Sequence, residues 1–365
     1  MKVKLDKLQK KWGDVVGADD ISLEIDDGEF VAFLGPSGCG KTTTLLMVAG
    51  IYKPTAGTID FDGRIVNEVP PRDRHIGMVF QSYALYPHMS VYGNISYPLR
   101  IQKINKTEMQ ERVQRVADMM GIGDLLDRKP GQLSGGQQQR VSLGRALVKE
   151  PELLLFDEPL SNLDARLRLT MRGELKRLQK DMGITSIYVT HDQVEAMTMA
   201  DRIAVMSAGI LQAFDKPDDL YDRPKTLFVA GFVGNPPMNF MDVEVTRDNG
   251  VFRARSDAVD LVVPADRGEP AAAHGGTVIL GLRPEDIAVA TAGSAGDGRT
   301  ASGEALAVEP LGREDLVVVQ VGTAELRLLV DTAVGVRVGD NVDLEFNTEK
   351  VQFFDPDTEQ SLLWS

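Results

Sequence analysis

Short apolar runs alternate with amphipathic segments along the first two thirds of the chain. The apolar runs have the length and composition of buried strands, and they are FVAFLG (30–35), LLLFDEP (153–159), ITSIYVTH (184–191) and RIAVMSAG (202–209). Two of the segments between them have the character of helices, KTTTLLMVAG (41–50) and ARLRLTMRGELKRLQKDMG (165–183). The second places its apolar side chains on one helical face, at Leu167, Met171, Leu175 and Leu178. This rhythm predicts an α/β fold, with a mostly parallel sheet flanked by helices.

The pattern changes near GNPPMNFM at 234–241, where two adjacent prolines indicate a boundary. Beyond it we expect no long amphipathic helix. Short alternating runs, with a hairpin signal at RDNG (247–250), predict an all-β module that closes into a small barrel. The segment TAGSAGDGRTASG (291–303) has the composition of a flexible insertion. We therefore expect two domains, residues 1–235 and 236–365.

Composition narrows the partners and the compartment. The 365 residues carry a formal net charge of −14, which argues against a nucleic acid or an anionic membrane bound through bulk charge. The single cysteine, Cys39, permits no intrachain disulfide and fits a reducing compartment. The N-terminal segment lacks the apolar core of a signal peptide, and no apolar run approaches the roughly 18 residues of a membrane span. We expect a cytoplasmic location.

The stretch GPSGCGKTT (35–43) matches the phosphate-loop pattern G-x-x-x-x-G-K-[ST], after a predicted strand and before a predicted helix. Its glycines allow backbone N–H groups to face phosphate oxygens, and the helix N-terminus adds positive potential. We expect Lys41 to reach the β- and γ-phosphates and the Thr42 hydroxyl to bind Mg²⁺. The candidate nucleotide-binding residues of this loop are Gly35, Pro36, Ser37, Gly38, Cys39, Gly40, Lys41, Thr42 and Thr43.

Polar residues follow several of the predicted strands. Asp157 and Glu158 end one of them, and ligands of open α/β sheets bind at such carboxyl ends. We expect Asp157 to bind Mg²⁺ and Glu158 to act as the general base toward water. His191 ends another strand at the same edge. Gln81 follows the strand-like IGMVF, where its amide can contact both Mg²⁺ and the attacking water. These residues are the catalytic and metal-binding candidates.

A second phosphate-binding candidate lies almost a hundred residues further along, in LSGGQQQR (133–140), where a hydroxyl adjoins two glycine amides. With the motifs above, in this order, residues 1 to about 235 resemble the nucleotide-binding subunit of an ABC transporter. The resemblance implies a P-loop ATPase domain with a helical subdomain, and ATP and Mg²⁺ as cofactors. It also implies a head-to-tail dimer, in which Ser134, Gly135 and Gly136 cap the γ-phosphate held by the partner's Lys41.

The same resemblance implies further roles, residue by residue. Trp12 matches the aromatic residue that stacks on adenine, and Gln137 belongs to the signature stretch with Ser134. Asp164 closes the loop SNLD (161–164) that lines the dimer contact. Gln81, Glu158 and His191 match the family's glutamine loop, catalytic glutamate and switch histidine.

Longer stretches narrow the resemblance to the ATPases of carbohydrate importers, which serve maltose, other oligosaccharides, polyols and glycerol 3-phosphate. In the C-terminal part, GLRPEDI (281–287), VEPLGRED (308–315) and FFDPDT (353–358) resemble the OB-like regulatory barrel of that group. This implies two membrane permeases that dock near Gln81–Tyr86, and indirectly a solute-binding protein outside the membrane. The chain itself is then peripheral, on the cytoplasmic face of the membrane.

Two other readings share this fold. One is an exporter or an inorganic-ion importer subunit, and importers of sulfate and iron also share the two-domain layout. A soluble ABC ATPase acting on nucleic acid fits less well, because this chain has one cassette, no heptad run and an acidic balance. The transported solute, a regulator of the barrel, and the choice between a homodimer and a heterodimer stay open at the level of sequence.

Overall fold

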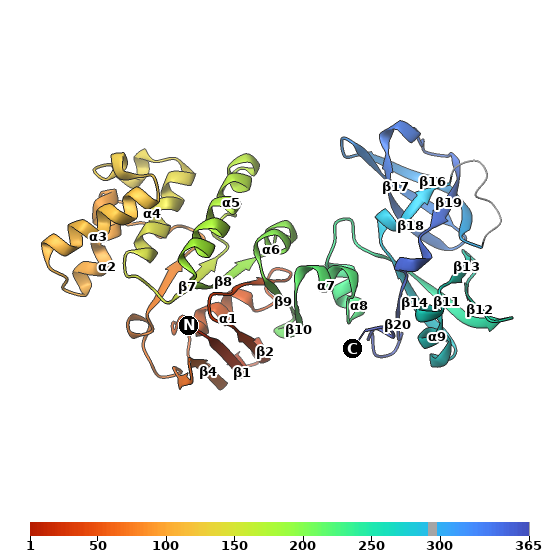
Figure 1. Ribbon diagram of the computed structural model, residues 1–365, viewed down its shortest axis with the longest axis horizontal. Helices are drawn as coiled ribbons and strands as arrows, with labels where there is room; N and C mark the ends of the chain where they lie inside the picture. The colour runs from red at the N-terminus through yellow and green to blue at the C-terminus, as the bar shows by residue number, and fades with distance from the viewer. Residues whose placement is uncertain (291–297, 365) are drawn as a thin grey trace. The chain divides into compact units, whose positions relative to one another are not determined.

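The computed structural model describes residues 1–290 and 298–364 (Figure 1). The chain divides into two compact units, Met1–Pro217 and Asp218–Ser365, and each is described by itself.

The central sheet of the first unit has six strands in the order β10-β9-β3-β8-β7-β6. Four of its five pairings are parallel (β3 with β8 and β9, β7 with β6 and β8), and β10 joins β9 antiparallel. The strands are β3 (Phe30–Leu34), β6 (Ile76–Val79), β7 (Leu153–Asp157), β8 (Thr185–Thr190), β9 (Arg202–Ser207) and β10 (Ile210–Asp215). All six residues of β8 and all five of β3 are buried, as expected for central parallel strands. The predicted parallel sheet is therefore present.

Helices flank this sheet or form a separate group. Those beside the sheet are α1 (Lys41–Val48), α5 (Ala165–Met182) and α6 (Gln193–Met199). In α5 the predicted apolar face buries Met171 and Leu175. A helical group, at the left of Figure 1, consists of α2 (Val91–Ile101), α3 (Lys106–Met119) and α4 (Gly135–Leu147). These three helices contact one another, so they form the helical subdomain that the resemblance implies.

A second, antiparallel sheet of the first unit was not among the predicted elements. Its order is β2-β1-β4-β5, with β1 (Val3–Trp12), β2 (Val15–Ile25), β4 (Ala56–Phe61) and β5 (Arg64–Ile65). Val3, Leu5 and Leu8 of β1 are buried, but a register shift lies between Leu5 and Leu8. Such a bulge breaks the two-residue alternation by which a half-buried strand is found in a sequence.

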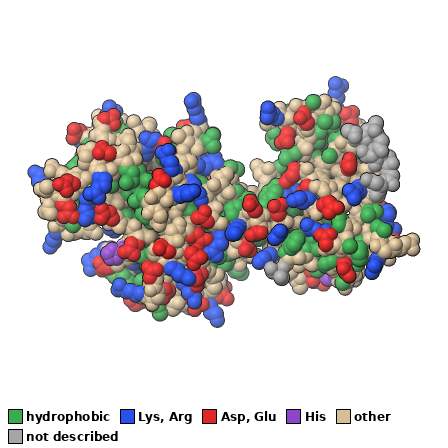
Figure 2. Space-filling model, viewed as in Figure 1, with side chains coloured by type: hydrophobic (Ala, Val, Ile, Leu, Met, Phe, Trp, Pro, Cys, Tyr) green, Lys and Arg blue, Asp and Glu red, His purple; other side chains and the backbone are tan. Residues whose placement is uncertain are grey.

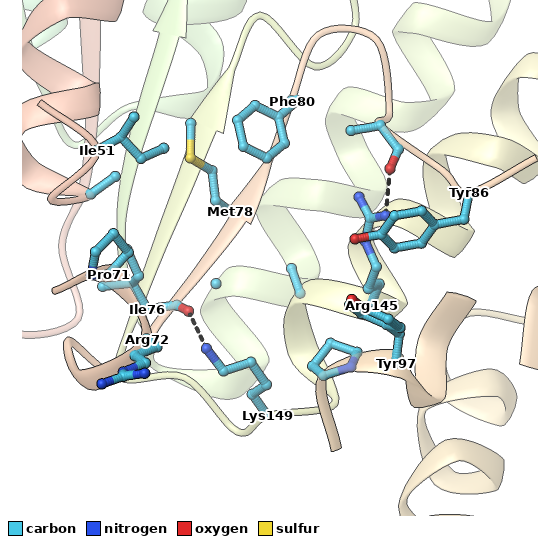
Figure 3. Close-up of a pocket in the computed structure, with 15 residues that line it drawn as sticks. Ile51, Pro71, Arg72, Ile76, Met78, Phe80, Tyr86, Tyr97, Arg145 and Lys149 are labelled. Atoms are coloured by element: carbon cyan, nitrogen blue, oxygen red, sulfur yellow. Dashed lines mark hydrogen bonds between the residues drawn. The ribbon is translucent and has the colours of Figure 1, made fainter. Parts of the chain in front are cut away.

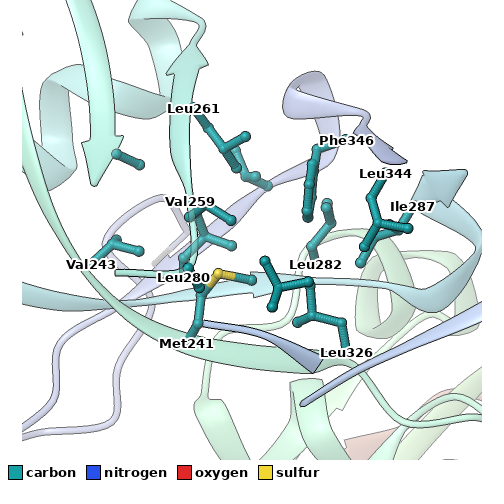
Figure 4. Packing of buried hydrophobic residues seen from close by; sticks show 14 of the residues in the cluster. Met241, Val243, Val259, Leu261, Leu280, Leu282, Ile287, Leu326, Leu344 and Phe346 are labelled. Carbon is teal, nitrogen blue, oxygen red and sulfur yellow. The ribbon is translucent and has the colours of Figure 1, made fainter. Parts of the chain in front are cut away.

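The second unit contains two antiparallel sheets of five strands. One has the order β13-β12-β11-β14-β20 and the other β15-β19-β16-β17-β18. The strands are β11 (Asn239–Asp248), β12 (Val251–Arg255), β13 (Asp260–Val263), β14 (Thr277–Leu282), β15 (Ile287–Val289), β16 (Thr300–Pro310), β17 (Glu314–Val321), β18 (Ala324–Asp331), β19 (Asn341–Phe346) and β20 (Gln352–Phe354). Both sheets contribute to one apolar core, where Val243 and Leu280 pack with Leu344 and Phe346 (Figure 4). The predicted RDNG hairpin joins β11 to β12 through Asn249 and Gly250, both at positive φ.

Two expectations for this unit need correction. Helix α9 (Ala265–His274) was not predicted, because an Ala- and Gly-containing segment with an internal proline gives little periodic signal. In the expected insertion at 291–303, residues 291–297 lie outside the described residues, and Thr300–Gly303 belong to β16. Gly303 of β16 pairs with Val342 of β19, so this end of the segment is part of a sheet and not a flexible loop.

The division between the two compact units, after Pro217, comes earlier in the chain than the predicted domain boundary at 235/236. Helices α7 (Pro217–Asp222) and α8 (Leu227–Phe232) belong with the second unit, apart from Pro217 itself. The buried Arg283 donates to the carbonyls of Tyr221 and Val233, and Leu227 N donates to Glu359 O at 2.8 Å. The prediction that residues 1–235 form the ATPase domain and residues 236–365 the regulatory barrel stays a prediction.

Candidate nucleotide-binding and hydrolysis site

The phosphate loop lies between β3 and α1, as predicted. Two of its glycines lie where the backbone of another segment comes very close. A Cβ at Gly35 would lie 2.2 Å from the Met206 carbonyl oxygen. Gly40 has φ of +103°, and a Cβ there would lie 2.4 Å from the Gly17 carbonyl oxygen. Because backbone atoms cannot move aside like a side-chain end, glycine is required at both positions. Cys39 is buried in this loop with 3% exposure.

Lys41 is the first residue of α1 and is only 5% exposed. Its Nζ donates to the carbonyl oxygens of Gly35 at 2.8 Å and Pro36 at 3.0 Å, so the side chain folds back over its own loop. No acidic residue stands in the first turn of α1. The ammonium group and the helix N-terminus therefore combine positive potential at one place, which suits a phosphate.

Thr42 and Asp157 meet across the sheet edge, and the Thr42 hydroxyl donates to Asp157 Oδ1 at 2.8 Å. Burial raises the pKa of the Asp157 carboxyl, which the bond from Thr42 opposes, while the neighbouring Glu158 carboxylate raises it further. Hydroxyl and carboxylate oxygens are ligands that Mg²⁺ accepts, with its remaining positions filled by water and phosphate. Among the described residues no cluster of three or more His, Cys, Asp or Glu side chains could hold a metal. The oxygen atoms of Thr42 and Asp157 fit a Mg²⁺ that accompanies a nucleotide.

Glu158 adopts a strained backbone conformation, with φ of +43°. Its N–H donates to Val189 O at 3.1 Å, and its carbonyl oxygen accepts from the Ser161 hydroxyl at 2.9 Å. The side chain lies with Oε2 at 3.2 Å from Nδ1 of the exposed His191. A non-glycine residue held at positive φ often marks a functional position, and here its carboxylate lies beside His191.

A cavity of about 340 Å³ brings many of the predicted residues together. Its lining includes residues Ser37–Thr43, Glu158, Gly17 and Trp12. Trp12 is 43% exposed and meets Tyr52 edge to face at 5.4 Å between ring centroids. A Cβ at Gly17 would lie 2.4 Å from the Trp12 ring, so the missing side chain makes room for this indole. A cavity lined by both an exposed indole ring and a phosphate loop suits a nucleotide, which has an aromatic base and phosphate groups.

The signature stretch does not line this cavity. Exposed Ser134 caps α4, and Gln137 completes a capping box, because Ser134 N donates to Gln137 Oε1 at 2.9 Å. Gly135 and Gly136 face Leu163 and Leu167, whose side-chain atoms would lie 3.2 and 3.0 Å from added Cβ atoms. Asp164 caps α5 by accepting from Leu167 N at 2.9 Å. The structure therefore groups the signature with the SNLD loop and separates it from the phosphate loop of the same chain.

Gln81 is exposed, and its backbone carbonyl accepts from Asn162 Nδ2 at 2.8 Å. The residues that follow it lie beside a second cavity, of about 370 Å³, between the helical subdomain and the sheet (Figure 3). Tyr86 lines this groove as expected, whereas Tyr83 does not and is only 7% exposed. Of the aromatic residues after Gln81, Tyr83 therefore belongs to the interior, whereas Tyr86 lies at the groove.

Sequence reasoning missed the basic side chains of this groove, which are Arg72, Arg145 and Lys149. Arg145 lies in the last turn of α4 and Lys149 two residues beyond its end, so their four-residue spacing was the available signal. Burial lowers the pKa of both groups. Arg145 lies 5.9 Å from the Tyr86 ring centroid, and Lys149 Nζ donates to Ile76 O at 3.3 Å (Figure 3).

Comparison with known proteins decides the family. The chain is 48% identical to the trehalose/maltose import ATP-binding protein MalK of Thermococcus litoralis, over 99% of each chain. The chain belongs to the ABC transporter family. It is also 49% identical to the xylose/arabinose import ATP-binding protein XacK of Haloferax volcanii, over 96% of this chain and 91% of that protein. The sn-glycerol-3-phosphate import ATP-binding protein UgpC of Ruegeria pomeroyi is 52% identical over 78% of each chain.

Family profiles and solved structures agree with this assignment. The ABC transporter profile matches residues 18–161, the MalK OB fold domain residues 234–287 and the TOBE domain residues 280–354. A dimeric ATP-binding cassette in a post-hydrolysis state, bound to ADP and Pi, superposes with a TM-score of 0.53 at 33% identity. It covers 59% of this chain and 98% of that one. The predicted fold class, an ABC ATPase with a C-terminal OB-like β-barrel, is confirmed.

As an ABC import subunit, the chain binds ATP with Mg²⁺ and hydrolyses ATP to drive transport. The relatives above are named as import subunits for trehalose and maltose, for xylose and arabinose, and for sn-glycerol 3-phosphate. These names favour a carbohydrate importer over the ion-importer alternative. No helix among the described residues is both long and apolar enough to cross a bilayer.

Proposed function

We propose that two copies of this chain form two composite ATP sites, each from the phosphate loop of one copy and the signature stretch of the other. The carrying observation is that Lys41 and Glu158 line one cavity, whereas Ser134 and Gly135 do not line it and Gly135 lies beside Leu163. Both halves have the chemistry of an anion site, and Ser134 is exposed at the start of α4. A second chain arranged head to tail supplies what each copy lacks.

Within a site we assign each residue a role. When ATP binds, Lys41 releases the carbonyl oxygens of Gly35 and Pro36 and donates to the β- and γ-phosphate oxygens. Carbonyl and phosphate oxygens both accept hydrogen bonds, so the ammonium group can exchange one set for the other. Thr42 and Asp157, with Gln81, hold Mg²⁺, which when bound neutralises developing phosphate charge. Glu158 accepts a proton from water.

Three residues hold the nucleotide and close the site. His191, beside Glu158, binds the γ-phosphate, and Trp12 stacks on the base. Asp164 lies in the loop at the contact between the copies.

The groove beside Gln81–Tyr86 is the proposed docking surface for a membrane permease. It combines apolar walls from Phe80 and Met78 with the basic groups of Arg145 and Lys149. Since the chain's relatives carry names of importers for trehalose and maltose, xylose and arabinose, and sn-glycerol 3-phosphate, we propose a carbohydrate or a polyol phosphate as cargo. Two permeases, supplied by a solute-binding protein, hold this subunit at the cytoplasmic face of the membrane.

A complementation experiment tests the composite site. Lys41→Ala disables the phosphate loop and Ser134→Arg fills the signature, so each variant alone should lose ATP turnover. An equal mixture forms heterodimers with one intact site, from Lys41 of one copy and Ser134 of the other, and should regain turnover. Ser134→Arg should still bind ATP as an isolated chain. If Ser134→Arg alone hydrolyses ATP at the wild-type rate, the site is complete within one chain.

Recovery of the tagged protein from native membranes tests the partners. Mass spectrometry should find two polytopic permeases and a solute-binding protein, whose ligand identifies the cargo. Recovery of nucleic-acid-binding or ribosomal proteins without permeases would contradict the importer assignment.

A further inference from the structure

Tyr83 lies between the docking groove and the signature stretch without lining the groove. Its backbone is in the left-handed region, with φ of +59°, and Ala84 follows at +48°. Two consecutive non-glycine residues in this region need outside support. Helix α4 gives it, because the Tyr83 carbonyl oxygen accepts from the buried Ser142 hydroxyl at 2.9 Å and from Arg145 Nη2 at 2.8 Å. The strained loop is therefore fixed to the middle of the signature helix.

The Tyr83 side chain extends from this attachment toward the beginning of the same helix. Its hydroxyl oxygen lies 3.9 Å from the position that a Cβ at Gly135 would occupy. Gly135 and Ser142 are seven residues apart, so they share one face of α4, and the phenol follows that face. Leu163 of the SNLD loop packs at the same glycine, 3.2 Å from the added Cβ. One residue thus contacts the helix where it is anchored and where the signature begins.

The groove is mechanically connected to this residue through Arg145. That side chain lines the groove beside Tyr86 (Figure 3). It donates to the carbonyl oxygens of both Ala84 and Tyr83. A partner segment that pushes on Tyr86 or Arg145 displaces the backbone of Tyr83. Because close-packed interiors shift between discrete arrangements and do not deform continuously, the displacement reaches the next packed group.

We propose that Tyr83 is a positioning residue that passes movement of the docking groove to Gly135 and Ser134. The inference rests on the proposed function, since it needs both a partner in the groove and a signature that acts on nucleotide. A residue that merely fills the interior would affect stability alone. A positioning residue affects how strongly the partner controls ATP turnover.

The test uses two substitutions that separate the ring from the hydroxyl. The hydroxyl has no hydrogen-bond partner among the described residues, so Tyr83→Phe keeps the ring contacts and loses no bond. Tyr83→Leu removes the part of the side chain that reaches Gly135. The assembled complex with its permeases, in lipid vesicles, is compared for co-purification, thermal midpoint, and kcat and KM for ATP with and without cargo-loaded binding protein.

We expect Tyr83→Leu to co-purify with the permeases and to keep its KM, while the cargo-stimulated kcat falls about tenfold. Tyr83→Phe should retain the stimulation of the wild type. Ser142→Ala, which removes one anchor of the loop and lines neither cavity, should reduce the stimulation less, and it serves if Tyr83→Leu does not fold. Full stimulation in Tyr83→Leu, or in Ser142→Ala where Tyr83→Leu does not fold, overturns the inference. Failure of the wild type to co-purify with permeases overturns the proposed function and this inference together.

Discussion

The sheet edge and the signature helix both have anion-binding chemistry, but they differ in how complete each is. At the edge, Thr42 bonds to Asp157 and Glu158 lies beside His191, although more than a hundred residues separate Thr42 from the acids. At the signature, Ser134 bonds to Gln137 of its own helix, and Gly135 lies beside Leu163 of the SNLD loop and the Tyr83 hydroxyl. The parallel sheet gathers its residues within one chain, whereas the signature helix presents its residues outward. This difference supports the proposed composite site, in which one chain holds the nucleotide and a second chain completes the site.

The largest expected effect comes from removing Glu158, the proposed general base at the sheet edge. Glu158→Gln keeps the size of the side chain but cannot accept a proton, so kcat should fall by about 10²–10⁴-fold. ATP affinity should persist, because Lys41 and the loop are untouched, and the chain should accumulate as an ATP-bound dimer by size-exclusion chromatography. Glu152→Gln, an exposed glutamate at the opposite end of β7, is the matched control. Near-normal hydrolysis in Glu158→Gln would assign the base elsewhere.

The glycines sharpen the comparison, beginning with the phosphate loop. In Gly40→Ala the new Cβ meets the Gly17 carbonyl at 2.4 Å, at a φ of +103° that alanine rarely adopts. We expect a loss of about 1–3 kcal/mol in the free energy of unfolding, together with loss of ATP binding. Gly131→Ala, where nothing lies within 4 Å, is the control. Denaturant titration and a fluorescent nucleotide measure the two effects, and unchanged values for Gly40→Ala would remove the requirement for glycine.

The residues at the sheet edge were predictable from the sequence for a physical reason. Phosphate loops and strand-end acids have local signals, and parallel strands bring those signals to one edge. The conformation of Glu158 and the anchoring of Tyr83 were not predictable, because both depend on partners more than thirty residues away. Strand β1 was missed because its bulge breaks the alternation. Local chemistry is thus visible in the sequence, whereas strain and burial depend on long-range packing.

The signature glycine should behave differently from Gly40. In Gly135→Ala the new Cβ meets only side-chain atoms, with Leu163 Cδ2 at 3.2 Å, and alanine favours a helix. The free energy of unfolding should change by no more than about 0.5 kcal/mol. ATP turnover should still fall about tenfold, because the added methyl group displaces the amides from the partner's nucleotide. A large loss of stability with normal turnover would show that this glycine serves packing only.

The smallest effect concerns the charge of Asp157. Burial raises the pKa of this carboxyl, so the folded chain holds the proton more tightly than the unfolded chain does. Stability is therefore lost as the pH rises from the ordinary range of an aspartate through the raised pKa, and the cost persists at neutral pH. Asp157→Asn lacks this cost and should melt a few degrees above the wild type at neutral pH, with the gap closing at acidic pH.

Adding ATP and Mg²⁺ should reverse the order of the two melting temperatures, so that the wild type melts above Asp157→Asn. With ATP and Mg²⁺ the wild type gains stability from binding, while Asp157→Asn has lost a proposed metal ligand and should gain less. Asp127→Asn, at an exposed position, is the control for a change of net charge alone. Thermal unfolding from acidic to neutral pH, with and without nucleotide, measures both effects. If Asp157→Asn melts below the wild type without ligand at neutral pH, the hydrogen bond from Thr42 stabilises the fold by more than burial of the charge costs. Asp157 would then contribute to folding as well as to binding Mg²⁺.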